Sequence, residues 1–145
     1  MPQTEVTALN HTLEETHEWL KALRSKGPFE TEQQAYSHMR AVLHAVRDRL
    51  TVEEAAHFAS ELPMLVRGFY YEGWRPALAP NKDRKTVEDF LDAVRESLGD
   101  RFTPAADLGA AATAVLELLT ERMAEGQVRH ARQQMPQDMQ AIWPG

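Results

Sequence analysis

The chain has 145 residues, of which 43% are hydrophobic and 26% charged, so it is long enough to bury a core of its own. Its net charge of −6 argues against a general affinity for nucleic acid or anionic membrane surfaces. It contains no cysteine, which excludes disulfides, thiolate metal sites and cysteine nucleophiles and fits a reducing, cytoplasmic setting. We therefore predict one soluble domain over residues 1–145, without an export signal or a membrane-spanning segment.

Helical spacing of apolar residues predicts a first helix over residues 4–26, capped by Thr4 and ended by Gly27. Its apolar stripe consists of Val6, Leu9, Leu13, Leu20 and Leu23. A second helix is predicted from Thr31, which forms a capping-box pattern with Gln34. Its apolar face consists of Ala35, Met39, Val42, Leu43, Val46 and Leu50. The residues predicted to point away from that face are Arg40, His44, Arg47 and Asp48.

Two shorter helices are predicted to follow. The pair Thr51 and Glu54 forms a second capping box, which starts a third helix. The apolar positions of that helix are Val52, Ala55, Ala56, Ala59 and Leu62. Pro63 suits the first position of a fourth helix, which frays near Gly73. The apolar positions of the fourth helix are Leu65, Val66, Phe69 and Tyr70.

Two prolines within residues 75–83 predict a non-helical connection between two halves of the chain. After it, a helix ending at Gly99 carries an apolar stripe of Val87, Phe90, Leu91, Val94 and Leu98. Thr103 and Pro104 are predicted to start the next helix, which continues to Met123. No region alternates apolar and polar residues for long enough to predict a β-strand instead of a helix.

The two halves resemble each other. Segment 18–24 matches segment 89–95 at an offset of 71 residues. At an offset of 73, segments 41–43, 49–50 and 62–63 match 114–116, 122–123 and 135–136. We therefore predict an all-α domain of two tandem helical-bundle repeats, 4–74 and 84–143, packed with pseudo-two-fold symmetry. Each repeat has about three helices and a short, proline-initiated fourth, and each alone has a marginal core.

The segments LPMLVRGFYYEGW at 62–74 and MPQDMQAIWPG at 135–145 resemble the family called domain of unknown function 2267. The resemblance runs from about Trp19 to the last residue, and Met135 and Gln140 depart from the pattern in the second half. It implies a bacterial, all-helical, cytoplasmic protein. It brings no established reaction, substrate or cofactor.

The pattern Glu-x-x-His occurs at Glu14 with His17 and at Glu54 with His57, and paired motifs of this kind on bundle helices hold dimetal centres. His57, however, is predicted to lie on the polar side of its helix. The matching pair in the second half, Gln127 and His130, lacks the carboxylate. We therefore predict surface histidines, and neither a metal nor another cofactor.

Arg49 and its repeat partner Arg122 each stand near the end of a helix, where a guanidinium can bind a carboxylate or phosphate ligand bidentately. The interpretation that we favour is structural: each arginine pairs with an acid or caps main-chain carbonyls.

Aromatic and arginine side chains cluster around Gly68 and Gly73, a composition typical of interaction surfaces. Because Phe69 and Tyr70 have repeat counterparts, we assign them to the core. The residues predicted to contact a partner or ligand are Arg67, Tyr71, Trp74 and Arg75.

The sequence carries no catalytic motif, so we predict no catalytic residue. The first hypothesis is a non-enzymatic module that binds a protein partner or a second copy of itself. The alternative is a small-molecule or metal-binding protein that uses the seam between the halves. Nucleic-acid recognition ranks last, because the basic cluster is limited to Lys82, Arg84 and Lys85.

Overall fold

The computed structural model describes residues 4–99 and 107–145. Over these residues the chain forms a single all-α domain without strands, as the sequence predicted. The helices are α1 (Thr7–Lys26), α2 (Glu32–Asp48), α3 (Val52–Ala59), α4 (Met64–Tyr71), α5 (Val87–Leu98), α6 (Leu108–Arg122) and α7 (Glu125–Gln133). Two 3-10 turns, η1 (Pro76–Leu78) and η3 (Met139–Ala141), follow α4 and α7. The predicted helix start at Thr103 and Pro104 lies outside the described residues; Asp107 caps α6.

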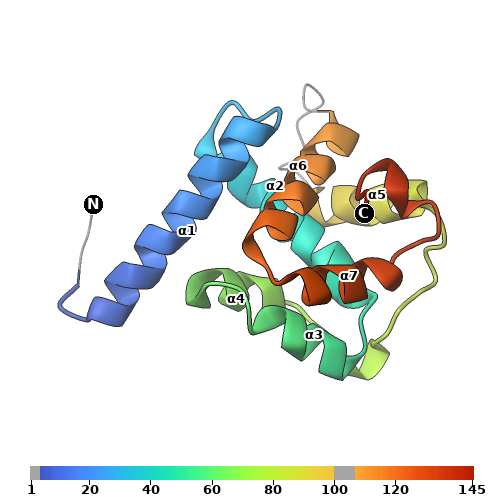
Figure 1. The fold of residues 1–145 in the computed structure, drawn as a ribbon, viewed down its shortest axis with the longest axis horizontal. Helices are drawn as coiled ribbons and strands as arrows, with labels where there is room; N and C mark the ends of the chain where they lie inside the picture. The colour runs from blue at the N-terminus through green and yellow to red at the C-terminus, as the bar shows by residue number, and fades with distance from the viewer. Residues whose placement is uncertain (1–3, 100–106) are drawn as a thin grey trace.

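Helix α2 runs through the middle of the molecule, and α1, α4, α5 and α6 pack around it (Figure 1). Its predicted apolar face is buried, but the prediction for the opposite face is wrong at His44 and Arg47, which are 8% and 4% exposed. The neighbouring helices cover most of both side chains. His44 instead contacts the Phe69 carbonyl at 2.7 Å, and Arg47 donates to the Tyr70 carbonyl at 2.8 Å. Two polar side chains of α2 therefore satisfy the C-terminal carbonyls of α4, which its own helix cannot pair.

Helix α1 buries Leu20 and Leu23 of the predicted stripe but not the first residues of that stripe. The buried residues of α1 are Thr12, Thr16, Trp19, Leu20 and Leu23. Val6 and Leu9, which the sequence assigned to the buried stripe, are 51% and 49% exposed. Thr4 is not the helix cap either: Val6 holds that position, and its side chain makes no capping bond. The first turns of α1 thus present apolar side chains at the surface.

Helices α3 and α4 begin in two different ways. Thr51 and Glu54 form the predicted capping box, with both reciprocal bonds present. The buried residues of α3 are Ala55, Phe58 and Ala59, so the predicted face is wrong at Val52, which is 47% exposed, and at Ala56, which is also exposed. Pro63 precedes α4 and has no hydroxyl to offer. The Thr12 hydroxyl of α1 accepts the Leu65 amide at 2.9 Å instead, so α1 caps α4.

One hydrophobic core joins both halves of the chain. Tyr70 from the first half and Trp143 from the last residues are among its largest buried side chains. The Tyr70 hydroxyl donates to the Ala55 carbonyl at 2.9 Å, and the Trp143 ring nitrogen donates to the Thr120 hydroxyl at 3.0 Å. Both large rings therefore fill the core with their polar atoms satisfied.

Candidate functional site

A pocket of about 610 Å³ lies between α1, α2 and α4. Its apolar lining comes from Leu13, Leu20, Leu65 and Phe69. Its polar lining includes His17, Glu32, Tyr36 and Glu72. The volume is in the range of ligand and peptide pockets, and the mixture of an apolar wall with a few polar groups is typical of them. We call this pocket the α1–α4 groove.

Two polar contacts between charged or titratable side chains lie beside the apolar wall of the groove. His17 Nδ1 lies 2.7 Å from a carboxylate oxygen of Glu32, which joins α1 to α2. Arg40 Nε donates to Glu72 at 3.0 Å, which joins α2 to the end of α4. Both pairs are partly exposed, so they add little stability but leave a polar border around an apolar surface.

Thr16 is one of the residues that line the groove, and its buried hydroxyl has no hydrogen-bond partner among the described residues. An unpaired buried hydroxyl costs about 1–3 kcal/mol in mutational studies.

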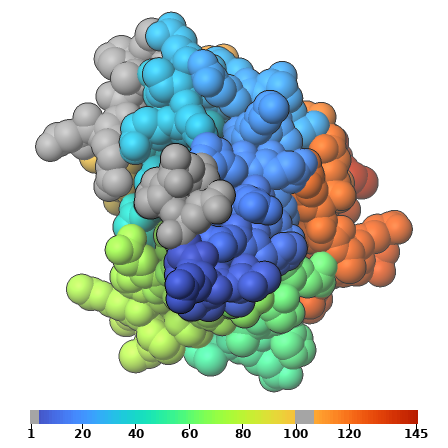
Figure 2. Space-filling view, turned by 90° about the vertical axis from the view of Figure 1, so that its left-hand side faces the viewer, coloured from blue at the N-terminus to red at the C-terminus, as the bar shows by residue number. Residues whose placement is uncertain are grey.

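Exposed apolar side chains continue from the groove along α1 and α4. Figure 2 faces this side of the molecule, with α1 in blue at its centre. The exposed large hydrophobic residues here are Val6, Leu9, Met64 and Leu65. Leu9 lies one helical turn before Leu13, and the Leu65 amide bonds to Thr12, so the two helix starts meet. We call these four residues, together with Leu13, the apolar stripe.

The structure separates the four residues that the sequence grouped as partner or ligand contacts. Tyr71 lines the α1–α4 groove. Trp74 and Arg75 line a different hollow of about 250 Å³, although the Tyr71 and Trp74 rings lie 5.4 Å apart. Arg67 donates to the carbonyls of Ala59 and Leu62, both at 3.0 Å, at the end of α3. Whether any of them contacts a partner stays a prediction.

Arg49 and Arg122 make different contacts. Arg122 forms a bidentate pair with Glu18 of α1, with one bond of 2.5 Å and one of 2.8 Å, and its guanidinium lies 6.0 Å from the Trp19 ring centre. The hydrogen bond from Arg122 lowers the pKa of Glu18 despite some desolvation. Arg49 donates to the main-chain oxygens of Gln134 and Arg84.

The tertiary structure brings together the Glu54-x-x-His57 segment of α3 and the Gln127-x-x-His130 segment of α7. His130 Nε2 lies 2.7 Å from a carboxylate oxygen of Glu54, and His57 and Gln127 line the same hollow. The repeat offset matches these positions in sequence but did not predict that they lie close together. Within residues 4–99 and 107–145, no three histidine or acidic side chains are placed to hold a metal ion.

The fold places this chain in the class of single all-α domains, here built around one buried helix, α2. The chain matches the family described as "Uncharacterized conserved protein (DUF2267)" over residues 16–142 and belongs to that family. No curated protein matches it. In the part of the chain that the structure describes, no helix is both long and apolar enough to cross a bilayer.

Proposed function

We propose that this protein is a non-enzymatic interaction module of the cytoplasm, and that it binds through the α1–α4 groove and the apolar stripe. The observation that carries the proposal is the placement of its exposed apolar residues. Four of the six exposed large hydrophobic side chains of the described residues lie at the starts of α1 and α4, next to the groove. Contiguous exposed apolar surface with a polar border is typical of protein interaction sites.

The occupant that this surface favours is a second copy of the chain. A two-fold axis beside Leu13 would place two α1 helices antiparallel. Val6 of one copy would then face Leu20 of the other, and Leu20 lines the groove. The surface is self-complementary in this arrangement, because the exposed start of each α1 covers the groove of its partner.

The mass of the protein in solution, measured by sedimentation over a wide concentration range, tests this proposal. We expect a concentration-dependent dimer for the unmodified chain. Leu9→Ser and Leu65→Ser should weaken the dimer without unfolding the chain, because both side chains are exposed. Leu78→Ser is the matched control, since Leu78 is 60% exposed and does not line the groove.

A monomer at every concentration would overturn the assignment of a second copy as the occupant. The same holds if Leu78→Ser weakens association as much as Leu9→Ser does, because association would then not depend on the stripe. Circular dichroism of each variant establishes that its helices are retained.

We further propose that residues 4–74 and 84–143 are copies of one ancestral unit. The order of elements supports this proposal: a short 3-10 turn follows three helices in the second half, where a short fourth helix follows three in the first. Arg49 and Arg122 occupy matching positions at the ends of α2 and α6. Superposition of α1–α3 on α5–α7 in an experimental structure is the test, and unrelated helix directions would overturn it.

A further inference from the structure

Arg49 is a buried cation at the seam between the two halves. It stands directly after α2, its exposed fraction is 8%, and it lines a hollow of about 350 Å³ between α2 and α5. Its Nε donates to the Gln134 carbonyl at 2.8 Å, and its Nη1 donates to the Arg84 carbonyl. Among the described residues, no carboxylate forms an ion pair with this guanidinium, and no group forms a hydrogen bond with its Nη2.

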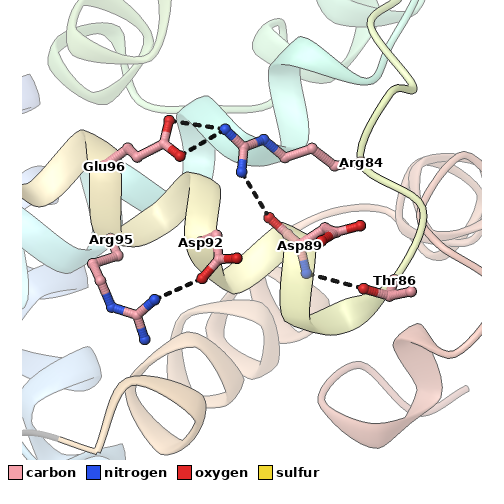
Figure 3. A network of polar contacts seen from close by, with 6 residues as sticks. All are labelled: Arg84, Thr86, Asp89, Asp92, Arg95 and Glu96. Atoms are coloured by element: carbon pink, nitrogen blue, oxygen red, sulfur yellow. Dashed lines mark hydrogen bonds and ion pairs between the residues drawn. The ribbon is translucent and has the colours of Figure 1, made fainter.

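The other charges around this hollow are balanced. Arg47 pairs with Asp48 at 2.9 Å. Figure 3 shows Arg84 bonded to both carboxylate oxygens of Glu96, each at 2.8 Å, and to the main-chain oxygen of Asp89. His44 adds no charge near neutral pH, because desolvation lowers its pKa to about 4. Among the described residues around this hollow, Arg49 is therefore the one charged residue whose charge no acidic side chain of the hollow balances.

Comparison with Arg122 shows what Arg49 lacks. Arg122 meets Glu18 of the other half, and the repeat alignment matches Glu18 to Asp89. The symmetric partner of Arg49 would therefore be Asp89. That carboxylate instead accepts the Lys85 amide at 3.1 Å, beside the start of α5. A buried unpaired charge is costly, and a bound anion would remove the cost.

We propose that the hollow between α2 and α5 binds a small organic carboxylate, with the Arg49 guanidinium as its anchor. The Ser97 hydroxyl and the Asn81 side-chain amide also line the hollow and supply further donors. Ala45, Phe90 and Ala93 provide an apolar wall for the ligand's carbon chain. One unbalanced charge matches a monoanion, so a carboxylate fits this site better than a dianionic phosphate.

Titration with sodium butyrate tests the proposal, observed by NMR at the Arg49 side-chain Nε–H and by the melting temperature at constant ionic strength. We expect butyrate to shift the Arg49 signal in a saturable way and to raise the melting temperature. Butanol has the same carbon chain without the charge, and inorganic phosphate has the charge without the chain. Both should bind at least about tenfold more weakly, because each lacks one of the two interactions.

Ala93→Leu fills the hollow and leaves every contact of Arg49 in place, so it should weaken butyrate binding about tenfold or more while the chain stays folded. Arg49→Met should abolish the binding as well. Arg75→Met is the matched control, because Arg75 is exposed and does not line this hollow. Failure of butyrate to bind, equal binding of butanol, tighter binding of phosphate, or full binding by Ala93→Leu would each overturn the proposal. None of these outcomes depends on whether the chain forms a dimer.

Discussion

Two threonines on α1, Thr12 and Thr16, show how strongly the partner of a buried hydroxyl matters. Both are buried and lie one helical turn apart on the same side of the helix. The Thr12 hydroxyl accepts the Leu65 amide, whereas the Thr16 hydroxyl has no partner among the described residues. The two positions thus form an internal comparison in which shape and burial are matched.

We expect Thr12→Val to lower the free energy of unfolding by about 1 kcal/mol, since valine keeps the shape but leaves the first turn of α4 without its cap. Thr16→Val should leave the stability unchanged or raise it, because it removes a hydroxyl that has no partner. Urea denaturation of the two variants measures the difference. Equal losses would mean that the threonines act through packing and not through hydrogen bonding.

His44 couples the stability of the fold to pH. Its Nε2 contacts the Phe69 carbonyl, and because a carbonyl only accepts, this nitrogen carries the proton of the neutral ring. Burial lowers the pKa from 6.5 to about 4 in the folded chain. Between these values the unfolded chain binds more protons, so the stability contributed by neutral His44 is complete above pH 6.5 and is lost as the pH falls toward 4.

His44→Gln retains a side-chain donor and removes the titration, so it should flatten the stability profile between pH 6.5 and 4, by at most about 3 kcal/mol. Thermal melts across this range provide the measurement. His57→Gln is the control, because His57 is exposed. His38, which is also buried on α2, is present in both variants, so their difference isolates His44. A profile that keeps the slope of the unmodified chain would contradict this assignment.

At the scale of the elements, the connection between α1 and α2 depends on close packing against α6. A Cβ atom at Gly27 would lie 2.6 Å from a Phe29 ring carbon and 2.8 Å from the Ala114 Cβ. Neither neighbour has room to move, because Phe29 and Ala114 are both buried. The turn therefore needs a residue without a side chain for reasons of space.

Gly27→Ala should lower the free energy of unfolding by about 1–3 kcal/mol through this overpacking. Gly126→Ala is the matched control. Gly126 lies within α7 and has open space around it, so alanine there should raise stability by about 0.5–1 kcal/mol. Chemical denaturation of both variants tests the pair. If Gly27→Ala were neutral, the contact with α6 would have to be looser than the structure shows.

At the scale of the whole molecule, α2 makes one folding unit of the two halves. Helices α5 and α6 of the second half pack on it directly. Ion pairs also join the halves across α1 and α6: Arg122 with Glu18, and Lys26 with Glu121 at 2.5 Å. Separation of the halves would expose the faces of α2 that α5 and α6 cover.

We expect fragments 1–80 and 81–145, expressed separately, to lack a cooperative thermal transition, because neither can bury α2 or replace it. Mixing the fragments should restore helicity, which circular dichroism measures. A sharp, independent melt of fragment 1–80 would show that the first half is a domain by itself.

The sequence by itself determined the family, the all-α class and several helix boundaries, among them the starts of α2 and α3 and the ends of α1 and α5. These features depend on local signals that the chain carries wherever it folds. Thr51 and Glu54 form their capping box from bonds within one turn, and the spacing of Met39, Val42 and Val46 predicts a buried face whatever covers it.

Only the tertiary structure decided how many sides of each helix are covered. An amphipathic pattern predicts that one side of a helix is buried and the other is exposed. Helix α2 has four neighbouring helices, which also bury His44 and Arg47 on its polar side. The start of α1 has too few neighbours to bury Val6 and Leu9. Ion pairing likewise depends on the tertiary structure. The sequence shows that both halves contain arginines and acidic residues, but which of them pair depends on distances across the seam between the halves. Burial and ion pairing are properties of neighbours that lie far apart in sequence, so the groove and the unpaired Arg49 became visible only once the helices were packed.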